Sequence, residues 1–281
     1  TEIMDSWVKQ TGFPVVDAHI SESEHDLAIE LSQHRFLYGN IEKPDPDPTS
    51  WQIPVNIGYA DSANGQSVLV TAKTLTVKSE VSTARWVKIN SGQAGFFRVR
   101  YTEDYWERLR SAVERQELAP TDRLSIQNDA YALMRAGYIP ATSFLSLARA
   151  YRQELAAPVW SDLALNLRGL EALLVNQPCA SAYRAFAGSI FSPMASQLAW
   201  EPVDGEAHLD SLRRTTVIGQ AGAYGDAAIL QEATRRFHAY TSDADSLHPD
   251  LRALVLNLAA QQGDRSTYDK IWELERESSL Q

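Results

Sequence analysis

The spacing of hydrophobic residues changes once along this chain, close to residue 101. Before that point apolar residues alternate with polar ones, as at Ile53, Val55 and Ile57, which is typical of half-buried strands. Beyond it they recur at helical spacing, which is typical of helices that bury one face. Strands and helices that occupy separate halves of a chain form an α+β protein. The sequence therefore predicts an antiparallel β-sandwich followed by an all-α domain.

Turn and loop signals divide the β region into short strands. The three prolines of Pro44–Pro48 cannot lie in a central strand and predict an extended surface loop. Asn64-Gly65 is the strongest hairpin signal in the chain. We expect strands at 27–37, 53–59, 68–70 and 75–81.

The stretch Trp86–Tyr101 ends the β region. Its two halves, Trp86–Asn90 and Phe96–Tyr101, are rich in aromatic and β-branched residues. Gly92 and Gly95 between them can adopt the positive φ that a turn requires. The pattern predicts a tight β-hairpin.

The rest of the chain contains one helical pattern after another, joined by short links. Thr102 and either Thr121 or Asp122 are expected to cap helices, Gly137 to end one, and Pro193 to kink or split one. Such a series predicts an α-solenoid, a superhelix of the HEAT or armadillo kind, whose concave face usually binds a partner. We expect helices at 102–113, 120–137, 142–155, 160–174, 181–200, 206–220, 226–240, 249–261 and 266–277.

The opening residues do not belong to the β pattern. Ile3, Met4, Trp7 and Val8 follow helical spacing, and the chain does not begin with Met. We interpret residues 1–12 as the tail of a domain that lies upstream. The predicted domains are therefore this tail (1–12), the β-sandwich (13–101) and the helical superhelix (102–281).

Charge and cysteine content exclude some classes of partner. Lys and Arg number 26 against 36 Asp and Glu, so the formal net charge is -10, which argues against nucleic acid and against an anionic membrane surface. No signal peptide or long apolar run is visible. Cys179, the single cysteine, has no partner for an internal disulfide, which favours a reducing compartment and predicts a cytoplasmic location.

The residues give no pattern of catalytic or metal-binding chemistry. None of the six histidines belongs to an H-E-x-x-H motif, and neither G-x-S-x-G nor a phosphate-binding loop is present. His19 and His25 flank a Ser-Glu-Ser-Glu run, for which a solvated loop is favoured over a loose metal site. Cys179 has no histidine near it in sequence. We therefore predict no catalytic residue, no metal ligand and no cofactor in this chain.

Motifs along nearly the whole chain resemble a known family. They are the runs Met4–Val16, Leu31–Leu37, Trp51–Val55, Trp86–Asn90, Gly95–Tyr101, Asp122-Arg123, Asn128–Leu133, Pro158–Trp160 and Pro249–Arg252. Together and in this order they resemble the zinc aminopeptidase family that includes aminopeptidase N, puromycin-sensitive aminopeptidase and the endoplasmic-reticulum aminopeptidases. The resemblance implies a β-sandwich and a helical domain that follow a catalytic domain. The helical region ends sooner than in the larger members, so it is either truncated or typical of a shorter branch.

The resemblance also implies a function. The family's zinc ligands and catalytic residues belong to domains upstream of Thr1, so zinc is expected in the parent enzyme, and this fragment alone is predicted to be inactive. It would be the non-catalytic C-terminal part of a zinc aminopeptidase that removes N-terminal residues from peptides. The helical part would enclose the active-site chamber and contact the C-terminal end of the substrate. The implied partners are peptides and the missing N-terminal and catalytic domains.

Arginines on the concave side of a helical domain could bind the carboxylate of such a peptide. Arg213 and Arg214 are the candidates, and because they are adjacent on a helix at most one is expected to face the cavity. Two other hypotheses stay open. The chain could be a helical-repeat scaffold that binds proteins without any link to peptide hydrolysis, or an enzyme with an unrecognised site.

Overall fold

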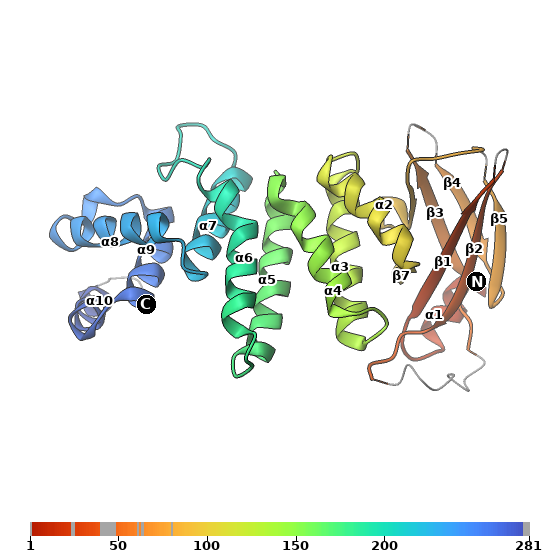
Figure 1. Ribbon diagram of the computed structural model, residues 1–281, viewed down its shortest axis with the longest axis horizontal. Helices are drawn as coiled ribbons and strands as arrows, with labels where there is room; N and C mark the ends of the chain where they lie inside the picture. The colour runs from red at the N-terminus through yellow and green to blue at the C-terminus, as the bar shows by residue number, and fades with distance from the viewer. Residues whose placement is uncertain are drawn as a thin grey trace. The chain divides into compact units, whose positions relative to one another are not determined.

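The computed structural model describes residues 2–23, 26–39, 49–60, 62, 65–79 and 81–277. They form two compact units, Thr1–Tyr151 and Arg152–Gln281, which we call the first and second units. The first unit contains the strands and the helices that directly follow them (Figure 1). The predicted division into domains at residue 101 stays a prediction. The expected loop at Pro44–Pro48 and Asn64 of the expected turn lie outside the described residues.

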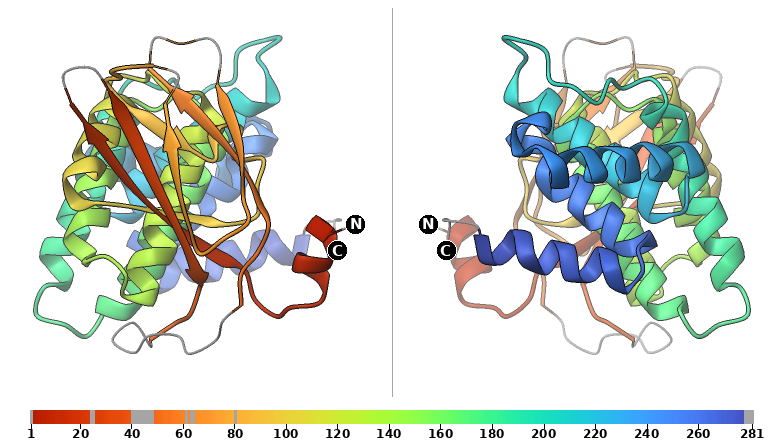
Figure 2. Two further views of the ribbon diagram at one scale, coloured as in Figure 1. Left: turned by 90° about the vertical axis from the view of Figure 1, so that its right-hand side faces the viewer. Right: turned by 90° about the vertical axis from the view of Figure 1, so that its left-hand side faces the viewer.

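The strands of the first unit form a β-sandwich, as predicted. One sheet has the order β5-β2-β1-β7 and the other β4-β3-β6. The strands face the viewer in the left view of Figure 2. β3 shows the expected alternation, with Ile53, Val55 and Ile57 buried between more exposed neighbours. The strands are β1 (Pro14–Glu22), β2 (Leu27–Arg35), β3 (Ile53–Tyr59), β4 (Gln66–Val70), β5 (Thr74–Lys78), β6 (Val87–Ile89) and β7 (Arg98–Tyr101).

β1 was not predicted. Its first residues are buried without interruption, and its last ones are polar, so the sequence shows no clean period of two. β1 pairs antiparallel with β2 and parallel with β7. The β1–β7 pair is therefore an exception to the predicted antiparallel arrangement. The sequence favours a loop at His19, but this residue is an exposed part of β1; His25 lies outside the described residues.

The hairpin predicted at Trp86–Tyr101 is wrong. β6 pairs with β3 in one sheet and β7 pairs with β1 in the other, so the segment between them crosses from sheet to sheet. The crossover begins at Asn90, whose φ of 59° is left-handed, and Gly92 has a φ of 73°. The side-chain amide of Asn90 accepts a hydrogen bond from the Gly95 N–H and donates one to its carbonyl, both within 2.9 Å. The predicted turn is present, but it joins two sheets.

The helices follow the predicted series, with shifted ends. α3 begins at Pro120, one residue after its N-cap Ala119, because proline suits the first helical position; Thr121 and Asp122 lie inside the helix. α6 continues past Pro193 to Ala195. The helices are α1 (Glu2–Val8), α2 (Glu103–Glu114), α3 (Pro120–Ala136), α4 (Ala141–Ala148), α5 (Ala157–Leu174), α6 (Ala180–Ala195), α7 (His208–Ala223), α8 (Ala227–Ser242), α9 (Pro249–Gln262) and α10 (Arg265–Glu277), with 3-10 turns η1 (Ser91–Gln93), η2 (Arg149–Gln153) and η3 (Ala244–Ser246).

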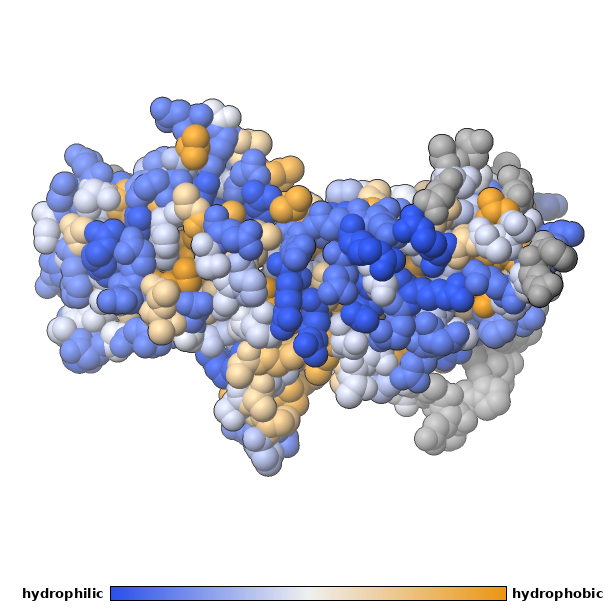
Figure 3. All heavy atoms as spheres, turned by 45° about the horizontal axis from the view of Figure 1, so that its top comes forward, coloured by the Kyte–Doolittle hydropathy of each residue, from blue (hydrophilic) through white to orange (hydrophobic). Residues whose placement is uncertain are grey.

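The face of the molecule drawn in Figure 3 is mostly hydrophilic, with separate apolar patches. Leu165, Leu173 and Val175 of the second unit are among the large apolar side chains that are more than half exposed. Of the helices in the described part of the chain, none combines the length and the hydrophobicity that a bilayer span requires.

Candidate functional site

A groove of about 940 Å³ lies on the second unit, lined by residues of α5, α7 and α9. Many of the lining residues are small, including Ser161, Ala164, Gly219 and Ala253. Small side chains leave room above the helices, so the surface is hollowed. This volume is within the range that suits a peptide segment or a small organic ligand.

The three helices run parallel, with α7 in the middle. Between α7 and α9, Ser211 Oγ donates to Asp250 Oδ2 (3.3 Å) at the N-terminal ends. At the C-terminal ends, Gln261 Nε2 donates to the carbonyl of Ala223 (2.9 Å). Similarly, Arg213 Nη1 of α7 donates to the carbonyl of Leu155, which lies two residues before the start of α5 (2.8 Å). The floor of the groove is therefore a layer of parallel helices. Hydrogen bonds join the corresponding ends of neighbouring helices.

The groups that shift the pKa of Tyr224 are consistent with the parallel arrangement of α5 and α7. This residue follows the last turn of α7, and burial raises the pKa of its phenol. The carboxylate of Glu171 raises that pKa further, while the guanidinium of Arg168 opposes the rise. Glu171 and Arg168 belong to the C-terminal half of α5, so the C-terminal ends of α5 and α7 lie near each other.

The groove carries charges of opposite sign toward its two ends. Asp250 lies in the first turn of α9, where a carboxylate also suits the helix dipole. Arg168 lies in the C-terminal half of α5, and its Nε is 3.9 Å from Glu171 Oε2, a loose ion pair of a half-exposed side chain. Arg168 is the cationic residue among those that line the groove. Its guanidinium keeps donors that a carboxylate could accept from.

Between these ends the polar lining residues are uncharged, and they lie among apolar ones such as Leu254 and Leu258. Thr215, Gln220, Asn257 and Gln261 supply hydroxyl and amide groups. Gln220 Oε1 is buried and has no hydrogen-bond donor in the described part of the chain. Side-chain amides that both donate and accept can bind the backbone of an extended peptide whatever its sequence.

The structure places the two predicted arginines outside the groove lining. Arg214 is buried, and its guanidinium forms a forked ion pair with Glu206 and donates to the carbonyl of Ala199. Arg213 donates to the Leu155 carbonyl and pairs with Asp210 (3.1 Å). Their role in peptide binding stays a prediction.

Arg168 was not singled out in the sequence. A signal was present, because Ser161, Leu165 and Arg168 are spaced i, i+4, i+7 and so share one face of α5. The opposite face carries the buried Leu163 and Leu170, so the exposed face could have been identified from the helical pattern. Which exposed face lines a groove depends on how α5, α7 and α9 pack, and the sequence does not supply that.

The absence of metal-binding chemistry was an expectation of the sequence. In the described part of the chain no three or more His, Cys, Asp or Glu side chains are grouped so that they could hold a metal ion. The described residues therefore offer no group to which a zinc ion can be assigned, and the absence of a metal ligand from the chain stays a prediction.

The comparisons with known proteins identify the family. Residues 86–281 match the model of the ERAP1-like C-terminal domain, and the chain belongs to this family of aminopeptidase C-terminal regions. It is 32% identical to aminopeptidase M1 of Arabidopsis thaliana over 99% of its own length and 33% of that protein. It is 23% identical to the puromycin-sensitive aminopeptidase of Caenorhabditis elegans over all of its length and 30% of the relative. The chain thus spans about a third of the curated relatives that it matches.

Proposed function

We propose that this chain is the non-catalytic C-terminal part of a zinc aminopeptidase and that its groove holds the C-terminal end of a peptide substrate. The observation that carries the proposal is the position of Arg168, the cationic side chain of a groove whose other lining residues are apolar, uncharged polar or, at Asp250, acidic. Family membership supports the aminopeptidase assignment, since the relatives are aminopeptidases about three times as long. The enclosure of an active-site chamber by the helical part belongs to the same proposal.

The groove would act by binding and orientation alone. The Arg168 guanidinium would bind the terminal carboxylate through two parallel N–H···O bonds, the strongest geometry for this pair. The amides of Gln220 and Asn257 would bind the peptide backbone. Fixing the far end of a substrate in this way would orient the amino end toward a catalytic domain that lies in the rest of the protein.

The geometry sets a length for the ligand. Arg168 lies eleven residues after Ala157, the first residue of α5, which is about 17 Å along the helix. Asp250 is near the opposite end, two helices away, or about 20 Å across. The diagonal of about 25 Å corresponds to roughly eight residues of extended peptide. Peptides of this length would reach both charged ends.

Fluorescence anisotropy of the chain with labelled eight-residue peptides tests the proposal. Each peptide is made with a free and with an amidated C-terminus. We expect the free carboxylate to bind more tightly, by about tenfold or more for a charged bidentate contact. Arg168→Ala should abolish that preference. Arg235→Ala is the control, because Arg235 pairs with Glu232 on α8 and does not line the groove.

The other outcomes of this experiment are informative. Equal binding of the two peptide forms would contradict carboxylate recognition at Arg168. If Arg213→Ala or Arg214→Ala removes the preference while Arg168→Ala does not, the arginines predicted from the sequence are the contacts. Binding of folded proteins but of no peptide would favour the scaffold hypothesis. The parent gene tests the enzymatic part, which requires an upstream H-E-x-x-H motif. A cytoplasmic location also stays part of the proposal.

A further inference from the structure

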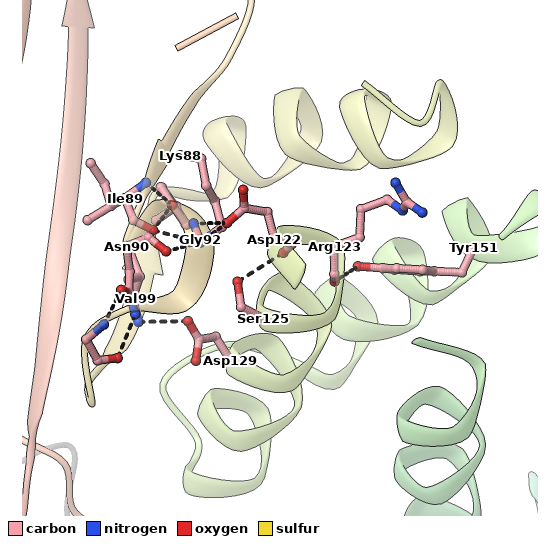
Figure 4. A network of polar contacts seen from close by, with 12 residues as sticks. Lys88, Ile89, Asn90, Gly92, Val99, Asp122, Arg123, Ser125, Asp129 and Tyr151 are labelled. Carbon is pink, nitrogen blue, oxygen red and sulfur yellow. Dashed lines mark hydrogen bonds and ion pairs between the residues drawn. The ribbon is translucent and has the colours of Figure 1, made fainter. Parts of the chain in front are cut away.

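Two carboxylates of α3 bind the backbone at both ends of the crossover between the sheets. Asp122 Oδ1 accepts a hydrogen bond from Gly92 N (2.8 Å), and Asp129 Oδ2 accepts one from Val99 N (3.1 Å) (Figure 4). The two aspartates are spaced i, i+7 and therefore lie on one face of the helix. Neither was predicted as a site. Both carboxylates are directed at the same segment, Asn90–Val99, from two turns of one helix.

A buried lysine completes the cluster. Lys88 is 1% exposed, and its Nζ donates to the carbonyls of Ile89 (2.7 Å) and Asn90 (3.4 Å) while lying 3.9 Å from Asp122 Oδ1. Arg98 pairs with Asp129 at 3.1 Å. Burial lowers the pKa of Lys88 and raises that of Asp129, because both charges have lost water. The four side chains balance two positive charges against two negative ones.

Two tyrosines attach the same region to the start of the helices. β6 is an edge strand of its sheet, so one side of its backbone has no neighbouring strand. Ile89 N donates to the hydroxyl of Tyr101 (2.9 Å), and Val87 N donates to the hydroxyl of Tyr105 in α2 (2.6 Å). Both hydroxyls are well buried, and burial raises the pKa of each tyrosine. The free edge of β6 is therefore covered by β7 and α2.

We propose that Lys88, Asp122, Asp129 and Arg98 form a charge lock, which makes the crossover segment and α3 open only together. The inference goes beyond the proposed function and does not depend on it. Opening the crossover alone would separate buried charges from their partners, and an uncompensated buried charge is strongly unfavourable. The lock therefore excludes a hinge between the sandwich and α2–α3. The sandwich and these helices would move as one body.

Native-state hydrogen exchange of the whole chain, resolved by residue, tests the lock. We expect the amides of Gly92 and Val99 to exchange as slowly as that of Ala130 in the middle of α3, because all three need the same opening. Faster exchange of Gly92 and Val99 than of Ala130 would mean that the crossover opens without α3, which would overturn the proposal.

Asp129→Asn separates a lock from independent contacts. The asparagine keeps an acceptor for Val99 N but loses the charge that balances Lys88 and Arg98. We expect the Gly92 amide to lose protection at least about 100-fold, although its own acceptor, Asp122, is unchanged. Loss of protection at Val99 alone would falsify the lock. Ser125→Ala is the control, since it removes a buried neutral hydrogen bond to the Asp122 carbonyl and should affect both amides little. If Asp129→Asn does not fold, Lys88→Met/Asp129→Asn removes one charge of each sign and provides the same readout.

Discussion

Arg214 shows why a residue type does not define a role. Its side chain is 7% exposed and is used to hold the segment before α7, through Glu206 and the carbonyl of Ala199. Arg168, with the same chemistry, has only a loose partner and faces the groove. From the sequence both are arginines on amphipathic helices. What distinguishes them is whether a carboxylate within reach already uses the guanidinium, and that depends on the loop conformation at 196–207.

Because of the Arg214–Glu206 ion pair, we expect the folded chain to lose stability in acid. Hydrogen bonds from Arg214 lower the pKa of Glu206 from its usual value near 4.5 to about 2. A lowered folded-state pKa stabilises the fold above pH 4.5, and this stabilisation is lost as the pH falls toward 2. In thermal unfolding followed between pH 6 and 2, we expect Glu206→Gln to start from a lower midpoint at pH 6 and to lose less on acidification than the unmodified chain. Arg213→Ala, which leaves the pair intact, should keep the original pH dependence; the same weakened dependence in both variants would contradict this assignment.

Alanine substitutions at two glycines of α7 are expected to differ in their effect on stability. A Cβ on Gly222 would lie 2.6 Å from Leu258 Cδ2 and 3.1 Å from Ile229 Cγ2, so Gly222→Ala should destabilise by about 1–3 kcal/mol through overpacking. A Cβ on Gly219 would meet Leu254 Cδ1 at 3.2 Å, and that side chain can move. Gly219→Ala should therefore be close to neutral, because the helix propensity gain of about 1 kcal/mol offsets the contact. Urea unfolding measures both, and an equal loss in the two variants would refute the packing argument.

Helix caps give a second prediction at this scale. The carboxylate of Asp226 accepts from Ala228 N and Ile229 N at the start of α8, both at 3.2 Å. Thr102 occupies the corresponding position before α2, but its side chain makes no capping hydrogen bond. We expect Asp226→Ala to cost about 1 kcal/mol of unfolding free energy and Thr102→Ala clearly less. Chemical denaturation provides the comparison. A larger loss at Thr102 would contradict the cap assignment.

The elements also show what the sequence could predict. The spacing of apolar residues predicted most of the helices and β2–β5, because each of these elements buries one face and its apolar residues recur with the matching period. It missed β1, where Val15 and Val16 are buried in succession. It also misassigned the crossover, because a short turn between two apolar runs fits a hairpin as well as a change of sheet. The pairing of β6 with β3 and of β7 with β1 depends on contacts distant in sequence. The groove depends on distant contacts in the same way.

At the scale of the whole molecule, the two compact units predict two unfolding transitions. Each unit has its own buried core, for example Leu31 in the first and Val217 in the second, so each can unfold cooperatively by itself. Calorimetry should show two transitions that variants can assign. Leu31→Ala removes a fully buried side chain, at a cost of about 2–5 kcal/mol, and should lower only one midpoint. Gly222→Ala should lower only the other. A single transition displaced by both variants would mean that the sandwich and all the helices unfold together, and the charge lock would then be one part of a larger cooperative structure.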